Sequence, residues 1–200
     1  MTKMNRVGLF LMIIGIVAGL YYSFEWYKGK SSAQHLKDEE VKQLEQKYNE
    51  VSVHSVIPSS NTQYKEGEKV AKLYIPKMEK KFTVYWGSSE ETLKKGVGMY
   101  AGNMTTVPSN GGHTVLSGHR DTVFFKLGDL KEGDHLILEY DNKMYTYEIQ
   151  KKWITHADDR TVIVKKKTPT LTLTTCYPFD YIGDAPDRYI VQAKFLRMGQ

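Results

Sequence analysis

The chain has 200 residues, a net charge of +5 and a single cysteine. Its 40% hydrophobic and 12% aromatic content excludes a wholly disordered chain. The one cysteine excludes an internal disulfide. The basic residues are spread along the whole chain, and no aromatic-interleaved basic motif accompanies the one dense run, residues 165–167, so we expect no nucleic-acid partner. The length accommodates one ordinary domain plus an appendage.

Residues 7–24 form an uncharged apolar stretch of about 18 residues, close to the minimum that spans a bilayer core. Lys3 and Arg6 precede it, so residues 1–6 are expected to be a cytoplasmic tail and the later residues to lie outside the cytoplasmic membrane. A cleaved signal peptide has a similar pattern. However, bulky aromatic residues follow the stretch, and the small residues 31–33 lie too far downstream for easy cleavage. We therefore favour an uncleaved single-pass transmembrane anchor.

Residues 25–68 are predicted to form a stalk and linker. Residues 35–50 are rich in Lys, Glu and Gln, and a thin apolar stripe at helical spacing favours a solvated helix that lifts the next domain off the membrane. Residues 52–67 are polar and include Pro58, which is typical of a linker. The catalytic or binding domain is then expected at residues 69–200.

From residue 69 onward, short β-branched and apolar runs alternate with turn residues. A short helix is predicted from Ser88, with Glu91 three residues later as in a capping box, and is expected to end at Gly96 and Gly98. A hairpin turn is predicted at residues 141–143. Strands are predicted at residues 70–75, 82–86, 113–117, 135–140, 144–153, 170–176 and 188–196. About eight short strands with few helices predict a mainly β fold, a single closed barrel.

Cys176 ends one predicted strand, directly before Tyr177 and Pro178. Proline cannot donate to a sheet, so the strand should end here and leave the thiol beside a loop at the barrel rim. A lone cysteine usually only packs. As a nucleophile it needs a nearby cation and donors for an oxyanion. His119 follows one strand and Arg188 begins another, so the three residues together predict a Cys-His-Arg site at one rim.

The sequence TLTTC that ends at Cys176, together with the segment Gly118-His119-Arg120-Asp121 and with Arg188, resembles the sortase family and within it class D sortases. The resemblance covers residues 70–195. It implies a single eight-stranded sortase-type β-barrel with short helices, preceded by the N-terminal transmembrane helix and stalk. It also implies a membrane-anchored cysteine transpeptidase of a Gram-positive cell surface, which cleaves an LPxTx sorting signal after its Thr.

The same resemblance implies residue roles. Cys176 is expected to form a thioester with the sorting signal, and His119 to act as general acid and base. Arg188 is expected to bind the oxyanion and the substrate backbone, with Arg160 and Arg197 as alternatives. Thr175 and Asp121 are expected to support these three residues, because they lie beside them in the sequence. Asp121 could orient His119, although capping of the next turn explains it equally well.

The segment 154–168, which precedes the cysteine strand, is expected to be a wall of the substrate groove. Val162, Ile163 and Val164 are candidates to receive the Leu-Pro of the signal, although plain packing explains them almost as well. The remaining histidines singled out are expected to be structural: His113, His135 and His156. No cofactor is expected to be required. Carboxylates in the segments 158–159 and 184–187 could hold calcium, but paired carboxylates are common in turns, so the metal stays open.

The implied partners are surface proteins with a C-terminal LPxTx signal, an amine on a peptidoglycan cross-bridge or lipid-linked precursor, and the membrane. Two other functions fit the same residues. A cysteine peptidase would use water as its acceptor, and an amine-linked product would exclude it. A tethered, noncatalytic barrel would bind a surface peptide with Cys176 merely packed, and ready alkylation of Cys176 would exclude that function.

Overall fold

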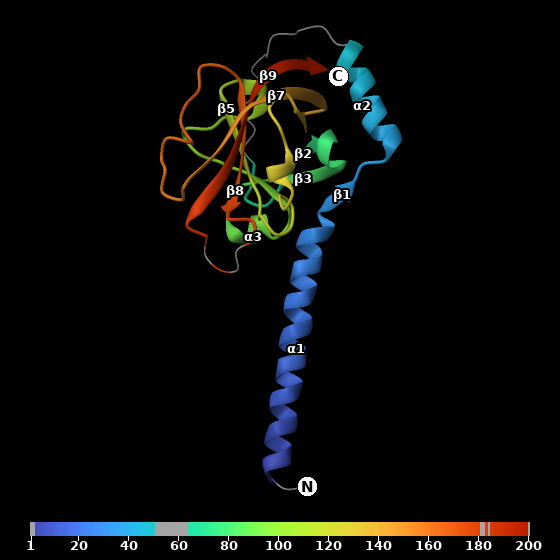
Figure 1. Ribbon diagram of the computed structural model, residues 1–200, viewed down its shortest axis with the longest axis vertical. Coiled ribbons are helices and arrows are strands. Elements are labelled where there is room, and N and C mark those ends of the chain that lie inside the picture. The colour runs from blue at the N-terminus through green and yellow to red at the C-terminus, as the bar shows by residue number, and fades with distance from the viewer. Residues whose placement is uncertain (1–2, 51–63, 181–182, 184, 200) are drawn as a thin grey trace.

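A computed structural model of the chain describes residues 3–50, 64–180, 183 and 185–199 (Figure 1). Three α-helices and three 3-10 helices are described: α1 Lys3–Ser31, α2 Asp38–Glu50, α3 Glu90–Leu93, η1 Pro76–Met78, η2 Pro108–Asn110 and η3 Leu127–Asp129. The strands are β1 Ala33–His35, β2 Lys69–Ile75, β3 Lys80–Trp86, β4 Val97–Met99, β5 His113–Ser117, β6 His135–Tyr140, β7 Lys143–His156, β8 Thr170–Tyr177 and β9 Asp187–Gly199.

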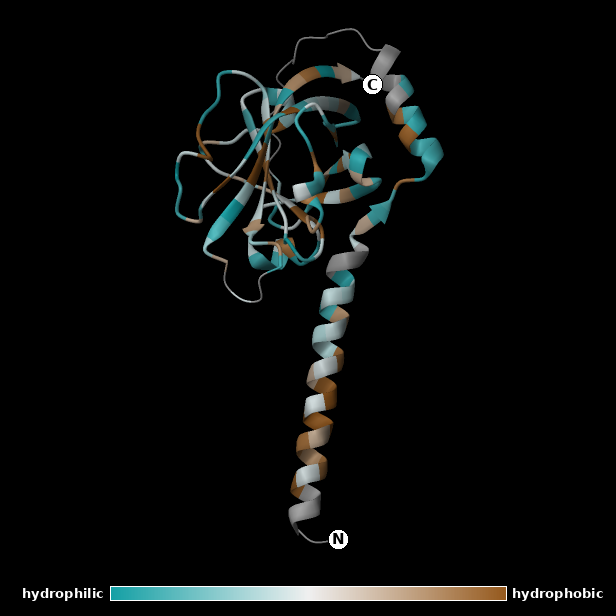
Figure 2. Cartoon of the chain, viewed as in Figure 1, coloured by the Kyte–Doolittle hydropathy of each residue, from teal (hydrophilic) through white to brown (hydrophobic). Residues whose placement is uncertain are grey.

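Helix α1 projects from the rest of the protein as a long rod (Figure 1). Its segment Val7–Lys28, 22 residues long, is long and apolar enough to cross a bilayer, and none of its apolar window is buried inside the protein. Figure 2 shows apolar residues concentrated in the N-terminal part of α1, whereas α2 is largely polar. An apolar helix surface without protein contacts indicates a single-pass membrane anchor.

Eight strands close into a barrel. Their order is β3-β2-β6-β7-β9-β8-β5-β4, and β4 pairs with β3 to complete the ring. The pairs β3–β4 and β5–β8 are parallel, and the other pairs around the ring are antiparallel. The predicted mainly β, eight-stranded sortase-type barrel behind an N-terminal apolar helix is therefore confirmed.

Alternation along the strands fills the barrel interior. In β8, Leu171 and Leu173 belong to the buried core, and Leu116 of β5 and Val191 of β9 pack in the same cluster. All four have relative exposures of 0%. Burial of each such side chain contributes roughly 1.5–3 kcal/mol to folding. This core fixes which residues of β8 face outward, where the functional site lies.

The hairpin predicted at residues 141–143 is present. Asp141 and Asn142 both have positive φ, 51° and 56°, as a two-residue hairpin turn requires. Tyr140 pairs with Lys143, so β7 begins one residue earlier than its sequence pattern suggests.

The region predicted to end the first short helix differs in two ways. The N-cap is Ser89, which accepts a hydrogen bond from the Thr92 N–H, rather than Ser88. Residues 97–99, expected at the helix end, form strand β4. A Cβ on Gly98 would lie 2.4 Å from the Gly87 carbonyl oxygen, so this position requires glycine. A three-residue strand held by distant partners has too little local pattern to be recognised.

Part of the predicted stalk lies against the barrel instead of in solvent. Strand β1 pairs with residues 80–82 of β3, with Ala33 opposite Phe82, whereas β4 pairs with residues 84–86 of the same strand. Leu36 is only 1% exposed and donates its N–H to the Glu79 carbonyl oxygen at 2.9 Å. Glu40 of α2 forms an ion pair with a barrel lysine. The predicted linker falls largely on residues 51–63, which lie outside the described residues.

Candidate active site

Cys176 is the residue before the end of β8, and it lies on the outer face of the barrel. Leu171 and Leu173 point into the core. Because side chains alternate along a strand, Thr172, Thr174 and Cys176 point to the opposite face. The thiol is partly exposed. Because Leu171 and Leu173 pack in the core, the side chain of Cys176, the only cysteine in the sequence, faces a surface groove.

His119 reaches the same end of the barrel because β5 and β8 run parallel. Ser117 lies opposite Thr174 in the ladder, and the Gly118 N–H continues it by donating to the Thr174 carbonyl oxygen at 3.2 Å. Two residues beyond the Ser117 pair, His119 is level with Cys176. Parallel pairing therefore brings the histidine to the cysteine, although 57 positions separate them in the sequence.

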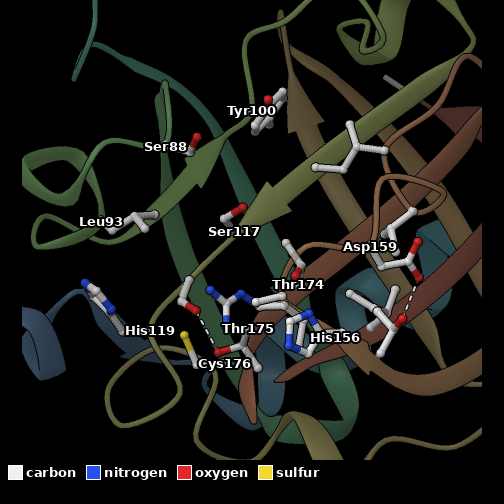
Figure 3. Close-up of a pocket in the computed structure, with 17 residues that line it drawn as sticks. Ser88, Leu93, Tyr100, Ser117, His119, His156, Asp159, Thr174, Thr175 and Cys176 are labelled. Carbon is white, nitrogen blue, oxygen red and sulfur yellow. Dashed lines mark hydrogen bonds between the residues drawn. The ribbon is translucent and has the colours of Figure 1, made fainter. Parts of the chain in front are cut away.

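The connection between these two strands is fixed by Thr175 and Gly118. Thr175 is 3% exposed, and its Oγ1 donates to the Gly118 carbonyl oxygen at 2.7 Å (Figure 3). A Cβ on Gly118 would lie 2.5 Å from Cγ2 of Val123 and 2.7 Å from a ring carbon of Phe124. Close packing, not an unusual backbone angle, therefore requires glycine directly before His119.

Arg188 lies directly opposite Cys176 in the antiparallel pair of β8 and β9. Opposed residues on one face are close enough for their side chains to meet. Its Nη1 donates to the carbonyl oxygens of Ala185 at 3.1 Å and Asp187 at 2.9 Å. These bonds hold the guanidinium at the rim, and the Nε and Nη2 N–H groups remain as further donors.

The three side chains line one cavity of about 290 Å³. The cavity is closed on its other sides by the end of β7, the segment after it, and residues near α3 and β4. The main lining residues there are Leu93, Tyr100, Thr155, His156, Asp159, Val162 and Ile163.

Cys176 and His119 lie on the same cavity without a hydrogen bond between them, within the ranges that the structure describes. Figure 3 shows the imidazole ring of His119 directed away from the sulfur of Cys176. Catalytic contacts are often long before substrate binds and shorten in the reactive complex. The structure therefore places the thiol, the imidazole and the guanidinium on one cavity, with the thiol–imidazole contact not formed.

The other predicted site residues are divided by the fold. Val162 and Ile163 line the cavity, whereas Val164 does not. Asp121 is exposed and, among the contacts of the described residues, makes no hydrogen bond to His119. Of the two alternative arginines, Arg160 lines an adjoining cavity and Arg197 lies at the far end of β9, opposite a residue of β7.

Some cavity residues had no recognised signal in the sequence. Tyr100 follows β4, which was not predicted, and it is 36% exposed. His156, expected to be structural, ends β7 and lines the cavity. Its Nδ1 accepts from the Asp158 N–H at 3.3 Å. Recognition of β4 and of the full length of β7 would have placed both residues at this rim.

One of the carboxylates considered for calcium, that of Asp159, forms hydrogen bonds within its own loop and to the end of β7. Asp159 accepts a hydrogen bond at 2.5 Å from Thr155 Oγ1, and bonds at 2.8 Å and 2.7 Å from the N–H and Oγ1 of Thr161. These hydrogen bonds, led by that of Thr155, lower the pKa of Asp159. Among described residues, no three or more His, Cys, Asp or Glu side chains gather as metal ligands. Asp184 lies outside the described residues.

Comparisons with known proteins agree with this geometry. A family model described as the sortase domain matches residues 73–196. Sortase D of Bacillus subtilis (strain 168) is 35% identical over 193 residues, which cover 94% of this chain and 96% of that protein.

Solved structures give the same result. The catalytic domain of B. anthracis SrtD is 73% identical, with a TM-score of 0.61 and coverage of 70% of this chain and 95% of that one. Sortase E1 from Streptomyces coelicolor, with a tripeptide in its active site, is 26% identical, with a TM-score of 0.60 and coverage of 66% and 90%. The chain therefore belongs to the sortase family of cysteine transpeptidases, and its similarity to Sortase D places it with class D.

Proposed function

We propose that this enzyme cleaves an LPxTx sorting signal after its Thr and transfers the surface protein that carries the signal to a cell-wall amine. The observation that carries the proposal is the convergence of Cys176, His119 and Arg188 on one cavity at the ends of adjacent strands. The amine belongs to a peptidoglycan cross-bridge or to a lipid-linked wall precursor.

In the first half of the reaction, the Cys176 thiol gives its proton to the imidazole of His119, and the thiolate attacks the carbonyl carbon of the signal's Thr. The scissile C–N bond then breaks, and a thioester forms on the enzyme. The leaving amine needs a proton, and the imidazole of His119 on the same cavity supplies it as general acid. The product released is the short C-terminal remainder of the signal.

In the second half, the acceptor amine attacks the thioester carbonyl. Its nitrogen forms a new amide bond, the C–S bond breaks, and the sulfur of Cys176 leaves. His119 now takes the proton that the amine must lose, so the same imidazole protonates the leaving amine and later deprotonates the acceptor amine. Water would compete with the amine for the thioester. Val162 and Ile163, which line the cavity, help to exclude that water.

Arg188 supplies the positive charge of the site. Its N–H groups at Nε and Nη2 can donate to the oxyanion of each tetrahedral intermediate or to the substrate backbone. The opposed position of Arg188 and Cys176 in the ladder holds this charge beside the attacked carbonyl. Thr175 acts behind the site, because its hydroxyl ties β8 to the loop that carries His119.

The proposed organisation follows from α1. Residues 1–6 form the cytoplasmic tail, residues 7–24 the anchor, residues 25–68 the stalk and linker, and residues 69–200 the catalytic domain. Basic residues before the anchor favour a cytoplasmic N-terminus, which leaves the catalytic domain on the outer side with the sorting signals and the wall amines.

Mass spectrometry on the full chain in detergent micelles tests the proposal. The enzyme is mixed with a panel of LPxTx peptides, with and without an amine acceptor, beside the Cys176→Ala variant. We expect a peptide thioester on Cys176, an amine-linked product that ends at Thr, and neither with Cys176→Ala. Cleavage that yields only a free carboxylate, whichever amine is supplied, would show a water-using peptidase instead. Failure of Cys176 to form any adduct or to alkylate would rule out both.

A further inference from the structure

His113 is a buried histidine that the proposed mechanism does not use. It begins β5 and has a relative exposure of 0%. Its Nδ1 lies 2.7 Å from the Val164 carbonyl oxygen, and its Nε2 lies 2.8 Å from Thr172 Oγ1. Gln192 Nε2 in turn donates to Thr172 Oγ1 at 3.2 Å. Both ring nitrogens are therefore engaged, one of them by the segment that forms the cavity wall.

The direction of each hydrogen bond in this chain follows from its partners. A carbonyl oxygen only accepts, so Nδ1 must carry the proton and donate it to Val164. In a neutral ring Nε2 then accepts, and the Thr172 hydroxyl donates to it while accepting from Gln192. Burial, the largest influence, lowers the pKa of His113 and keeps the ring neutral. Each of the three hydrogen bonds then has one donor and one acceptor, and both ring nitrogens of His113 have a partner.

The central part of the wall has few hydrogen bonds to the rest of the protein. Residues 157–169 connect β7 to β8 and contain no helix or strand. From residue 162 to residue 167, all of which the structure describes, the bond from His113 to the Val164 carbonyl is the only hydrogen bond to another part of the chain. Val162 and Ile163, the two residues before it, line the cavity.

The position of His113 explains why this bond can act on the wall. Thr170, opposite His113, and Thr172 lie on the outer face of β8 and are nevertheless buried, with exposures of 8% and 0%. Residues 157–169 cover this face of β8. They are not paired with it as a strand, so side-chain hydrogen bonds must join the two. An imidazole is long enough to bond both sides at once, and a buried bond of this kind costs its full desolvation penalty when it is broken.

We propose that His113 is a positioning residue, which fixes the wall formed by Val162 and Ile163 against the outer face of β8 through the carbonyl of Val164. The inference rests on the proposed function in one respect, because it takes this wall to contact the sorting signal. Displacement of the wall then weakens peptide binding. It leaves Cys176 and Arg188 in place, because those side chains are carried by ladder-bonded strands.

Two amide variants separate the two bonds of the ring. In His113→Asn the amide N–H lies near the position of Nδ1 and can still reach Val164. In His113→Gln the amide lies near the position of Nε2, so it keeps Thr172 and loses Val164. Thr172→Val is the matched control, since it removes the partner of Nε2 and leaves the bond to Val164.

Trypsin reports the position of the wall directly, because Lys165, Lys166 and Lys167 directly follow Val164. We expect His113→Gln in the full chain to be cut after these lysines about tenfold faster than wild type, the effect of one lost hydrogen bond. His113→Asn and Thr172→Val should stay within about twofold. With a cleaved LPxTx peptide, His113→Gln should raise KM about tenfold with little change in kcat, and alkylation of Cys176 should keep its rate.

Equal tryptic rates for His113→Gln and His113→Asn would overturn the proposal. A fall in kcat and in the rate of Cys176 alkylation as large as the rise in KM would overturn it too. If the variants do not fold, the ¹⁵N NMR signals of the wild-type imidazole decide, because an Nε2–H tautomer excludes the bond to Val164 and an Nδ1–H tautomer supports it. The tryptic and NMR measurements need no sorting signal, so they stand apart from any failure of the proposed transpeptidation.

Discussion

The two walls of the active-site cavity are held in different ways. One wall consists of β5, β8 and β9, whose pairing is continuous and which carry Cys176 and Arg188. The other wall, residues 157–169, has no regular structure and is tied down chiefly by the side chains of Asp159 and His113. The difference places Cys176 and Arg188 on paired strands, whereas Val162 and Ile163, which we propose contact the substrate, lie on a wall that a few polar contacts position.

Such a division predicts which kinetic parameter each change affects. Substitutions on the strand wall should lower the rate of the chemical steps, because they remove groups that act in the transition state. Substitutions in the irregular wall should act mainly on peptide binding and hence on KM.

His119→Ala should lower kcat/KM about 10³-fold, because a general acid and base contributes 10²–10⁴-fold. The effect should fall on kcat, with peptide KM nearly unchanged, and is measured by steady-state turnover of an LPxTx peptide. Asp121→Ala is the matched control in the same loop, and since Asp121 is exposed it should keep activity within about twofold. A large loss for Asp121→Ala would show that this carboxylate orients the histidine after all.

Arg188→Lys should lower kcat about 10²-fold although the positive charge is kept. A lysine ammonium cannot reproduce the planar donors of the guanidinium, and one oxyanion donor is worth about 10²–10³ in kcat. Arg160→Lys, in the adjoining cavity, serves as the control and should change little. Full activity of Arg188→Lys would show that the guanidinium fork has no part in the transition state.

Thr175→Val should lower kcat about tenfold and the free energy of unfolding by about 1–2 kcal/mol. The substitution leaves the buried carbonyl of Gly118 without its donor and loosens the tether between β8 and the His119 loop. Thr175→Ser keeps the hydroxyl and should retain most activity. Urea unfolding and peptide turnover measure the two effects. An unchanged kcat in a destabilised Thr175→Val would confine this bond to a structural role.

Asp159→Ala should raise peptide KM about threefold and leave kcat unchanged. Its carboxylate joins the end of β7 to Thr161, the residue before the cavity-lining Val162. Asp158→Ala is the control, because Asp158 is the preceding residue, is highly exposed and contacts only His156 among described residues. If both variants behaved alike, general surface charge rather than the position of the wall would govern binding.

Acid should weaken the tie of the irregular wall. Burial lowers the pKa of His113 from its ordinary value of 6.5. As pH falls below about 6.5, His113 becomes protonated in the unfolded chain but stays neutral in the folded chain. The free energy of unfolding therefore falls until the pH is below the pKa of His113 in the folded chain. Urea unfolding at pH 7 and 5.5 should show a smaller pH dependence for His113→Asn than for wild type.

Local pattern in the sequence was enough to predict much of the wall formed by β5, β8 and β9. The Thr and Leu residues of β8 alternate, so strand, inward face and outward cysteine follow from period two. The turn at Asp141 and Asn142 follows from the positive φ that these residue types tolerate. The grouping of Cys176, His119 and Arg188 was predicted from strand ends together with the family resemblance, and the fold brings these residues to one cavity.

The rest depended on contacts between distant segments. Strands β1 and β4 are three residues each, and their pairing with β3 has no counterpart in local pattern. Tyr100 and His156 line the cavity because the barrel closes beside them. Val164 was expected to receive substrate, but its described contact is the carbonyl bond to His113, a partner 51 positions away.

The sequence by itself determined the apolar anchor and the position of Cys176 at a strand end, because both depend on composition and pattern within a few residues. The number of short strands along the domain predicted the mainly β barrel. Only the tertiary structure decided that His119 lies level with Cys176, that residues 33–40 dock on the barrel, and that His113 secures the cavity wall. Those features depend on strand register and on burial, and both are set when distant segments pack, since a one-residue slip would turn each side chain to the other face.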